Sequence, residues 1–482
     1  AKGLPEERTT DFAYDNRGNI TQIKTLADDN TEERSDNFTY DDYGNVKTAT
    51  NGEKQLTKYT KYDALGNLIT MIDARDFTWR DEYDPAGALL SETDADNRQQ
   101  SYEYDKAGKA IKLIAADKSE TTFEYQGQQL DHIIEPAVIG KPDQDSPAGH
   151  ANSIKYDTAG RIIKITDATG RSYQTQYNAE GRLQSVIDGQ NNTTSYQYKN
   201  NQLSQTNYPT YSESYSYNNR EDLISSTVNA DSQQRQRTWD IDRDKRSTSQ
   251  TDTKGNTSQV FYDALGREIR RVDANDGVTQ YAYDDLDNLI EVIDAENRST
   301  VFSYDKANRL ISETKQQNQE TTEYSYDKTG NLKTILSAKD EYTTFIYSDA
   351  GLVKENRFYK NQIDTEPLKT VSYTYNAQGI IESYDDGTTT TQYEYDAKQQ
   401  ITKVTVDYGL FTKSYSYSYY PNGLKHTYTN PEGVVYTYTY DGNSQLLSVD
   451  IPEEGQYSFN DYQWLAPGQV TFPGGGQRQL EY

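Results

Sequence analysis

Short turns rich in aspartate and asparagine recur along the chain and could bind a hard cation. Two of them are Asp94-Ala95-Asp96-Asn97 and Asp273-Ala274-Asn275-Asp276-Gly277. Carboxylate and carbonyl oxygens are the ligands that Ca²⁺ takes in proteins, but the same residues also form turns by accepting backbone N–H bonds. The chain has neither an EF-hand loop nor a Gly-Gly-x-Gly-x-Asp spacing. We therefore predict that these turns are structural, with no metal and no other cofactor.

Tyrosine is the second residue type with chemical potential, because the chain has 44 of them and a phenol ring can stack against a sugar. Their regular spacing favours a structural role, in which rings pack on one another across neighbouring strands. Trp239 falls within this regular pattern and is predicted to be structural as well. Trp79 and Trp464 do not, so they are the better candidates for a surface contact.

Catalysis has few residues to rest on. The chain has no cysteine, which excludes disulfides and thiolate metal sites. Its three histidines are His132, His150 and His426, which are scattered in the sequence. His132 and His150 flank a proline-rich stretch, so we predict that both lie in a loop. Neither a Gly-x-Ser-x-Gly motif nor a phosphate-binding loop occurs, and we predict that the protein is not an enzyme and has no catalytic residue.

A repeat positions all of these residues. Its anchor is a Tyr followed by Asp, Asn or a substitute, and most steps between anchors are 20 to 22 residues. The predicted anchors are Tyr14, Tyr40, Tyr62, Tyr83, Tyr104, Tyr125, Tyr156, Tyr177, Tyr198, Tyr217, Trp239, Tyr262, Tyr283, Tyr304, Tyr326, Tyr347, Tyr375, Tyr395, Tyr420 and Tyr440, and Tyr462 and Tyr482 continue the period.

Each repeat has the same order of elements. An alternating run such as Thr322-Glu323-Tyr324-Ser325-Tyr326 predicts a strand with both tyrosines on one face. Asp-x-x-Gly-Asn/Arg follows and predicts a turn, in which Gly takes a left-handed conformation. Asp287 and Asn308 replace this Gly in two repeats. A second strand and a second turn complete the unit. The residues that define the structural anchors most clearly are Tyr62, Asp63, Gly66, Tyr83, Asp84, Tyr104, Asp105, Tyr262, Asp263, Gly266, Tyr283, Tyr304, Tyr326 and Gly330.

These units predict an all-β fold. About twenty two-stranded repeats would form one long antiparallel sheet over residues 1–482, a single repeat region. Open sheets seldom stay flat beyond about ten strands, so we expect the sheet to spiral into a hollow shell or barrel. Residues 126–150 are predicted to be a proline-rich loop insertion, with a smaller insertion at 360–369. Residues 452–482 are predicted to be irregular, truncated terminal repeats.

Composition limits the partners. The net charge of -27 disfavours nucleic acid and anionic membranes, which require basic patches. No run of about 18 apolar residues occurs, so no membrane span is predicted. The chain starts Ala1-Lys2-Gly3, without a Met or a signal-peptide pattern, and stops at Tyr482 within a repeat. We interpret it as a piece of a longer protein.

The consensus Tyr-Asp-x-x-Gly-Arg/Asn-Leu, at steps of about 21 residues, resembles the YD or Rhs repeat over nearly the whole chain. That family includes bacterial Rhs toxins, the cocoon-forming subunits of insecticidal toxin complexes, wall-associated proteins and teneurins. The resemblance implies a hollow β-shell that in toxins encloses a C-terminal toxin domain. Toxin members also cleave themselves at Asp-Pro-x-Gly-Leu with the help of upstream aspartates. Asp84-Pro85-Ala86-Gly87-Ala88 lacks the Leu, so we expect an ordinary turn there.

The hypothesis from the sequence is a non-catalytic shell, secreted or at a bacterial cell surface, that encapsulates or scaffolds a toxin or effector polypeptide of its own parent protein. The alternative is an adhesion or carbohydrate-binding module that contacts a cell-surface glycan or protein. A third alternative is a polysaccharide-active enzyme built on the repeat.

Overall fold

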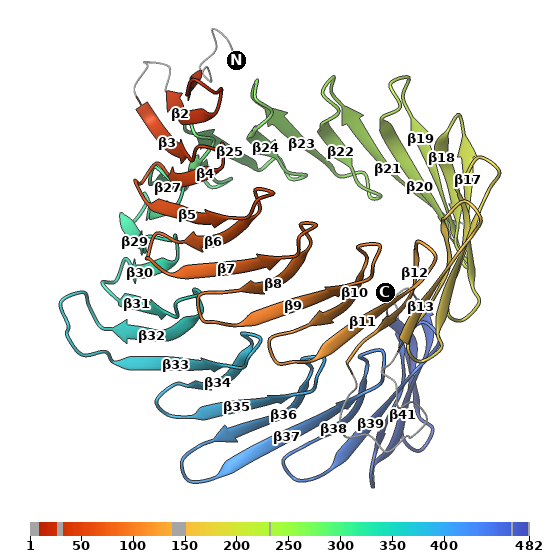
Figure 1. The fold of residues 1–482 in the computed structure, drawn as a ribbon. Coiled ribbons are helices and arrows are strands. Elements are labelled where there is room, and N and C mark those ends of the chain that lie inside the picture. Colours follow the sequence, from red (N-terminus) through yellow and green to blue (C-terminus); the bar gives the residue numbers. More distant parts are fainter. Residues whose placement is uncertain (1–8, 27–31, 137–150, 231–232, 464–465, 481–482) are drawn as a thin grey trace. The chain divides into compact units, whose positions relative to one another are not determined.

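The computed structural model describes residues 9–26, 32–136, 151–230, 233–463 and 466–480. Within these ranges the chain forms 43 strands of one sheet and no helix (Figure 1). The predicted all-β repeat fold, with two strands in each unit, is therefore confirmed. His150, Trp464, Tyr482 and most of the proline-rich stretch lie outside the described residues.

The first strands in chain order are β1 (Thr9–Tyr14), β2 (Ile20–Leu26), β3 (Glu32–Tyr40), β4 (Val46–Thr50), β5 (Leu56–Tyr62), β6 (Leu68–Ile72), β7 (Thr78–Tyr83), β8 (Leu89–Thr93), β9 (Gln99–Tyr104), β10 (Ala110–Ile114), β11 (Glu120–Gln126), β12 (Gln129–Ile134), β13 (Ala151–Tyr156) and β14 (Ile162–Thr166). They are followed by β15 (Ser172–Tyr177), β16 (Leu183–Ile187), β17 (Thr193–Lys199), β18 (Gln202–Asn207), β19 (Ser212–Tyr217), β20 (Leu223–Ala230), β21 (Gln233–Ile241), β22 (Ser247–Thr251), β23 (Thr257–Tyr262), β24 (Glu268–Val272), β25 (Val278–Tyr283), β26 (Leu289–Ile293), β27 (Ser299–Tyr304) and β28 (Leu310–Lys315). The last are β29 (Glu320–Tyr326), β30 (Leu332–Leu336), β31 (Tyr342–Tyr347), β32 (Val353–Tyr359), β33 (Lys369–Tyr375), β34 (Ile381–Asp385), β35 (Thr390–Tyr395), β36 (Ile401–Asp407), β37 (Thr412–Tyr419), β38 (Lys425–Thr429), β39 (Val435–Tyr440), β40 (Leu446–Ile451), β41 (Gly455–Gln463), β42 (Ala466–Thr471) and β43 (Gln477–Gln479).

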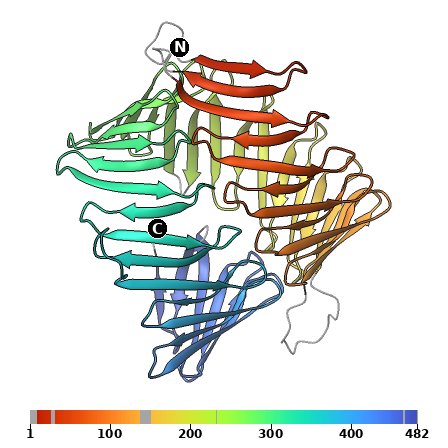
Figure 2. The same ribbon diagram turned by 60° about the vertical axis from the view of Figure 1, so that its left-hand side comes forward.

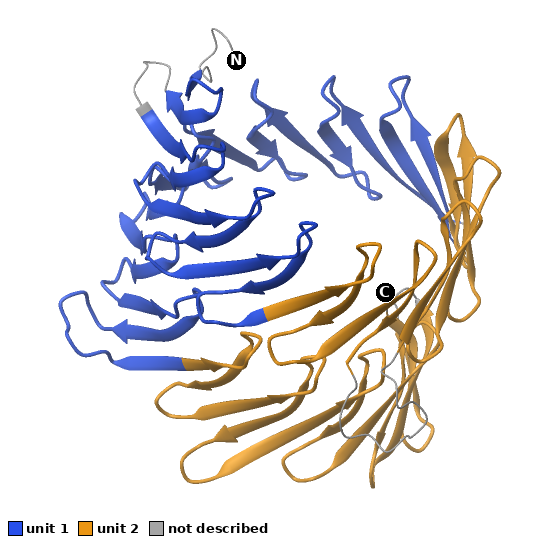
Figure 3. Cartoon of the chain, viewed as in Figure 1, with its two compact units in different colours: residues 1–99, 213–372 blue, residues 100–212, 373–482 orange. Residues whose placement is uncertain are grey.

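The chain divides into two compact units, each made of two ribbon segments (Figure 3). Unit 1 comprises residues 1–99 and 213–372, and unit 2 comprises residues 100–212 and 373–482. Within a segment, consecutive strands pair antiparallel. Each ribbon therefore has turns along both of its edges. We call the loop after an anchor the YD turn and the loop after the second strand the return turn.

Most YD turns and return turns share one hydrogen-bond pattern. In the YD turn Asp327–Asn331, the Asp327 N–H donates to the Asn331 carbonyl at 2.8 Å, and the Gly330 N–H donates to the Asp327 carbonyl at 3.2 Å. Asp327 Oδ1 also accepts the N–H groups of Thr329 and Asn331. The return turn Asp73–Phe77 repeats all four bonds. This is a three-residue hairpin loop that ends in a left-handed residue.

The left-handed position does not require glycine. Gly330 has a φ of 95°, and Asp287 and Asn308 take φ values of 66° and 62° in the same position, as predicted. Lys118 and Glu221 also adopt it, at 71° and 67°, although neither has a short polar side chain that favours this conformation. The hydrogen bonds of the turn therefore hold these residues in a conformation that they do not prefer on their own.

The anchor tyrosines connect each repeat to the one before it. The Tyr304 hydroxyl donates to the Leu289 carbonyl at 2.8 Å, and the Tyr326 hydroxyl donates to the Leu310 carbonyl at 2.7 Å. The accepting residue is the first of the second strand in the preceding repeat. The same bond is made by Tyr40, Tyr62, Tyr125, Tyr177, Tyr198, Tyr262, Tyr283, Tyr347, Tyr395, Tyr419 and Tyr462. A Phe would pack equally well but could not make it.

The last residue of the YD turn strengthens this connection. Arg309 donates through Nε to Asp305 Oδ2 at 2.7 Å, and its guanidinium lies 4.7 Å from the ring centroid of Tyr326. Arg267 bonds Asp263 in the same way and lies over the next anchor ring. Where this residue is Asn, as at Asn331, its amide donates to the turn Asp. Each element of the sequence consensus thus has a defined contact.

Two predicted anchors were wrong by one or two residues. Strand β21 continues past Trp239, and Ile241 takes the anchor position before the turn Asp242–Arg246. Strand β37 ends at Tyr419, whose hydroxyl makes the anchor bond to Ile401. Tyr420 instead begins the YD turn in the place of Asp. In both cases the position of the turn, rather than the aromatic residue, sets the register.

Two predicted irregular regions contain regular strands. Gln129–Ile134 form β12, the second strand of a repeat, so residues 126–150 are not a loop throughout. His132 lies in this strand, and its assignment to a loop was wrong. Residues 452–482 include β41, β42 and β43, which pair in sequence like earlier repeats. The prolines of this tail lie at strand ends and turns, where the missing N–H is tolerated.

Replacing Tyr304 with Phe tests the anchor bond. Burial, together with the nearby charge of Asp284, raises the pKa of Tyr304, so its hydroxyl remains a donor at neutral pH. We expect the variant to lose about 1 kcal/mol of stability, because the Leu289 carbonyl loses its partner. Urea unfolding measures the loss. Tyr173→Phe is the control, since Tyr173 is 43% exposed, and its change should stay below about 0.5 kcal/mol. Equal losses would refute the anchor role.

Candidate functional site: the turn seam

In both units, return turns of the earlier ribbon segment contact YD turns of the later one. We call this line of contacts the seam. In unit 1 it joins the turns near residues 51–55, 73–77 and 94–98 to those near 305–309, 327–331 and 348–352. Figures 1 and 2 show the turns at one end of β5–β8 facing those of β29–β32. The seam brings together residues that are more than 250 positions apart in the sequence.

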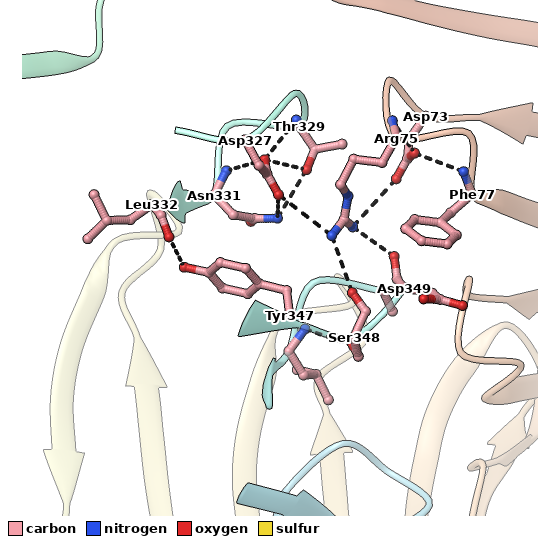
Figure 4. Close-up of polar contacts among 12 residues, drawn as sticks. Asp73, Arg75, Phe77, Asp327, Thr329, Asn331, Leu332, Tyr347, Ser348 and Asp349 are labelled. Carbon is pink, nitrogen blue, oxygen red and sulfur yellow. Dashed lines mark hydrogen bonds and ion pairs between the residues drawn. The ribbon is translucent and has the colours of Figure 1, made fainter. Parts of the chain in front are cut away.

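Arg75 is the most connected residue of the unit 1 seam (Figure 4). Its guanidinium donates to the carbonyls of Ser348 at 3.2 Å and Asp349 at 2.7 Å. It also pairs with the carboxylates of Asp73 at 3.6 Å and Asp327 at 3.7 Å. The Arg75 side chain is only 14% exposed. A single cation thus connects its own turn with two YD turns of the other segment.

The neighbouring turn is held by a carboxylate. Asp96 accepts a hydrogen bond from the Ser348 hydroxyl at 2.7 Å and another from the Ala350 N–H at 3.2 Å. Ser348 replaces the usual turn Asp at this position. A second Asp there would place two carboxylates together, so the Ser matches the Asp on the opposite segment.

The seam of unit 2 uses mainly amide groups. Asn443 Nδ2 donates to Asp188 Oδ2 at 2.7 Å, and Gln190 Nε2 donates to Asp441 Oδ2 at 2.8 Å. Further contacts join Asn422 to Asp167, Arg171 to Ser444, Gln399 to Asp117, Gln378 to Ser119 and Lys398 to Glu135. These contacts join polar side chains of return turns to polar side chains of YD turns.

Three glycines allow the segments to approach closely. A Cβ on Gly442 would lie 2.3 Å from the Gly189 carbonyl oxygen, and a Cβ on Gly189 would lie 1.9 Å from the Gly442 oxygen. In unit 1, a Cβ on Gly52 would lie 2.2 Å from the Lys306 oxygen. All three follow the first residue of their turn, and none occupies the left-handed position. Their role is therefore close backbone contact rather than unusual backbone conformation.

The spacing of contacts reflects the repeat length. Arg75 reaches Ser348 across 273 positions, whereas Asp96 reaches the same Ser348 across 252. In unit 2, Arg171 reaches Ser444 across 273 positions and Asp188 reaches Asn443 across 255. The larger and smaller separations differ by about one repeat. Successive return turns of the earlier segment thus meet the later one at intervals set by the repeat.

Hydrogen bonds favour the charged form of the seam carboxylates. Burial alone would raise the pKa of Asp188, but the bonds from Asn192 and Asn443 outweigh it and lower the pKa. The pKa of Asp96 is lowered in the same way, against the effect of burial, by Ser348 and the Ala350 N–H. Asp167 and Asp327 also have lowered pKa values despite burial.

These shifts predict acid sensitivity. A carboxylate whose pKa is lower in the folded state stabilises the fold above its unfolded pKa, about 3.9 for Asp, and loses that contribution as the pH falls through the folded value. We expect the seam to be stable at pH 5–7 and to weaken below about pH 4. Amide exchange measures this loss of seam stability. The exchange rates of the seam turns would be compared between pH 6 and pH 3, after correction for the intrinsic rates. Asp188→Asn should reduce the pH dependence in its own turn and leave that of the Asp96 turn unchanged.

The predicted anchor residues do not converge on one site. Tyr62, Asp63 and Gly66 lie in one YD turn, and their counterparts in other repeats recur along the sheet in most of the other YD turns. The Tyr83 hydroxyl donates to Asp81 Oδ2 at 3.5 Å. Asp84 forms an ordinary YD turn, in which Oδ1 accepts the N–H groups of Ala86 and Ala88. The contacts of the seam were not predicted from the sequence.

The aspartate-rich turns use their oxygens internally or across the seam. Asp94 is paired with Arg98 at 2.5 Å, and Asp273 Oδ1 accepts two backbone N–H bonds. Among the described residues, no group of three or more His, Asp or Glu side chains is arranged to hold a metal ion. In the same part of the chain, no helix is long and apolar enough to cross a membrane.

The repeated anchors, the shared hairpin loop and the seam define a repeat sheet of the shell class. The family model for the teneurin YD-shell matches residues 4–135 and 313–466, more than half of the chain. The chain belongs to this family. The model for the RHS repeat matches residues 156–193, 262–299 and 283–320. No curated protein sequence matches.

Solved structures of toxin-complex proteins share the fold. The TcdB2-TccC3 crystal structure superposes with a TM-score of 0.71 at 12% identity, over 96% of this chain and 30% of that one. TcdB2-TccC3-Cdc42 gives 0.66 at 14% identity, with the same coverage. The Tc holotoxin pore of Photorhabdus luminescens gives 0.56 at 14% identity, over 96% of this chain and 29% of that one. This chain thus spans about 30% of the length of these structures.

Proposed function

We propose that this chain is a non-catalytic wall segment of a YD-repeat shell that encapsulates or scaffolds a toxin or effector polypeptide of its parent protein. The parent protein would be secreted or displayed at a bacterial cell surface. The wall would act by exclusion, keeping the enclosed polypeptide away from proteases and from the host cytosol.

The observation that carries this proposal is the seam. A wall that only supported other domains would need no more than the pairing between neighbouring strands. Every segment already has this pairing. A wall that contains something must also close the gap between ribbon segments that are distant in sequence. Hydrogen bonds, ion pairs and glycine contacts join the segments in both units. Membership of a shell family supports the same function.

Protease protection in the intact parent protein tests the proposal. The open reading frame that contains this chain would be expressed whole, treated with a nonspecific protease and analysed by mass spectrometry. We expect a segment outside the YD repeats to resist digestion until the wall is opened. The variant pair Gly189→Ala and Gly442→Ala should open it and expose that segment.

Two results would count against containment. One is that no segment outside the repeats is protected in the wild-type protein. The other is that its protection is the same in the seam variants, even though amide exchange shows that the seam has opened. Gly476→Ala, which places a Cβ where nothing lies within 4 Å, is the control and should leave protection unchanged.

A further inference from the structure

One hairpin of unit 1, formed by β20 and β21, extends beyond the strand that follows it (Figure 1). β20 has 8 residues and β21 has 9, whereas β22 has only 5. β20 pairs with β21 from Gln233 to Thr238. On its other side, β21 pairs with β22 only over Thr238–Ile241. Among the described residues, Gln233–Arg237 therefore has a strand on one side alone, and we call this stretch the open edge.

The open edge offers backbone groups that the sheet does not use. In an antiparallel sheet, successive residues of a strand direct their N–H and C=O groups alternately to the two neighbouring strands. Every second residue of the open edge thus presents a donor and an acceptor to the side that β22 does not reach. No backbone hydrogen bond from another described segment covers this side. An edge of this kind can accept an extended peptide as an additional strand.

Two arginines give the open edge a positive charge. Arg235 and Arg237 are both exposed, and side chains two residues apart project from the same face of a strand at a spacing of about 7 Å. Within the described residues, neither guanidinium makes an ion pair or a side-chain hydrogen bond. Arg246 and Arg267, by contrast, are bound by the carboxylates of their own turns. In a chain with a net charge of -27, the open edge is thus a distinct cationic site.

The backbone groups and the arginines together define the partner. Acidic residues at alternate positions of an extended peptide also lie about 7 Å apart on one face, so two of them would meet both guanidinium groups. Arginine can bind each carboxylate through two parallel N–H···O bonds. A sulfated polysaccharide could meet the arginines, but it has no amide ladder to match the alternating donors and acceptors. A second copy of the same edge would place arginines near arginines.

We propose that the open edge of β21 binds an acidic extended peptide as an added strand, with carboxylates at alternate positions paired to Arg235 and Arg237. Charged side chains on a free edge discourage pairing between identical copies. Here the same charges also select the partner, because they favour an acidic strand over a neutral or basic one. The proposal is independent of containment, since the site lies within one hairpin of unit 1 and requires no enclosed cargo.

Fluorescence anisotropy with a labelled peptide of alternating glutamate and threonine tests the proposal on the full chain. Background binding should be low, because the net charge of the protein repels an acidic peptide. We expect saturable binding of the alternating peptide, and binding about tenfold weaker for a peptide of the same composition whose glutamates are consecutive. N-methylation of one alternate set of peptide amides should abolish binding, whereas N-methylation of the other set should not, because only one set faces β21.

Variants identify the site. The double variant Arg235→Gln and Arg237→Gln should weaken binding of the alternating peptide about tenfold and leave the thermal midpoint unchanged, since both side chains are exposed. Arg80→Gln is the matched control, because Arg80 is also exposed but has paired strands on both sides; it should leave binding unchanged.

Four results would overturn the proposal. They are that the alternating peptide does not bind at millimolar concentration, that its binding survives the double variant, that neither set of N-methyl groups weakens it, or that a heparin fragment binds more tightly than the peptide.

Discussion

Arg75→Ala is expected to destabilise the seam of unit 1 by about 3 kcal/mol, because it leaves the largely buried carboxylates of Asp73 and Asp327 without their cation. It also removes the donors to the Ser348 and Asp349 carbonyls. Repeat proteins open locally, so the loss should appear first in the turns that Arg75 connects. We expect amide exchange in the turn of residues 348–352 to rise on the order of 100-fold.

Arg298→Ala is the matched control for this prediction. Arg298 also pairs with two carboxylates, Asp294 and Glu296, but both belong to its own turn and the side chain is 50% exposed. Exposed pairs contribute less than about 1 kcal/mol. A double-mutant cycle with Asp327→Asn isolates the contact across the seam. Similar exchange rates in the Arg75 and Arg298 variants would show that the Arg75 contacts do not hold the segments together.

Gly442→Ala should separate the two segments of unit 2. The added Cβ would meet the Gly189 carbonyl oxygen at 2.3 Å and its carbon at 2.8 Å. Both are backbone atoms and cannot rotate away as a side-chain end could. We expect a loss of about 2–3 kcal/mol and faster exchange in the turns of residues 188–192 and 441–445. The Asn443–Asp188 and Gln190–Asp441 bonds should break together.

The reciprocal substitution makes this test sharper. Gly189→Ala should cost a similar amount, because its Cβ meets the Gly442 oxygen. Once either alanine has separated the turns, the second should add little, so the double variant should be clearly less destabilised than the two single losses combined. If the two losses of stability are additive, each alanine destabilises its own turn and the contact between Gly189 and Gly442 is not the cause. Gly476→Ala again serves as the control.

Sequence reasoning found the fold because the fold is made of local interactions. The period of about 21 residues, the alternation before each anchor and the turn chemistry all lie within one repeat. Replacement of Gly by Asp287 and Asn308 was predicted for the same reason. Register was harder to predict. Trp239 and Tyr420 look like anchors, but the hydrogen bonds of the turns Asp242–Arg246 and Tyr420–Leu424 set the strand ends.

The seam could not be derived from local pattern. Its partners are separated by 251 to 282 positions, and nothing within one repeat encodes which turn will meet which. One signal was present, since Gly52, Gly189 and Gly442 lie in the second position of their turns, where no left-handed residue is needed. A glycine in that position indicates close approach of another backbone. Arg75 lies in a turn that needs only small polar residues. It is therefore a weaker indication that another segment lies close to this turn.

The arrangement of the seam also restricts how the length of such a chain can change during evolution. An insertion or deletion of a whole repeat between contacting segments would move every later YD turn along by one position, and each return turn would meet another turn of similar chemistry. A change of a few residues within a strand would instead displace all later contacts from their partners. Genes of this architecture should therefore gain and lose length in multiples of a repeat, or in loops away from the seam, such as the one between β32 and β33.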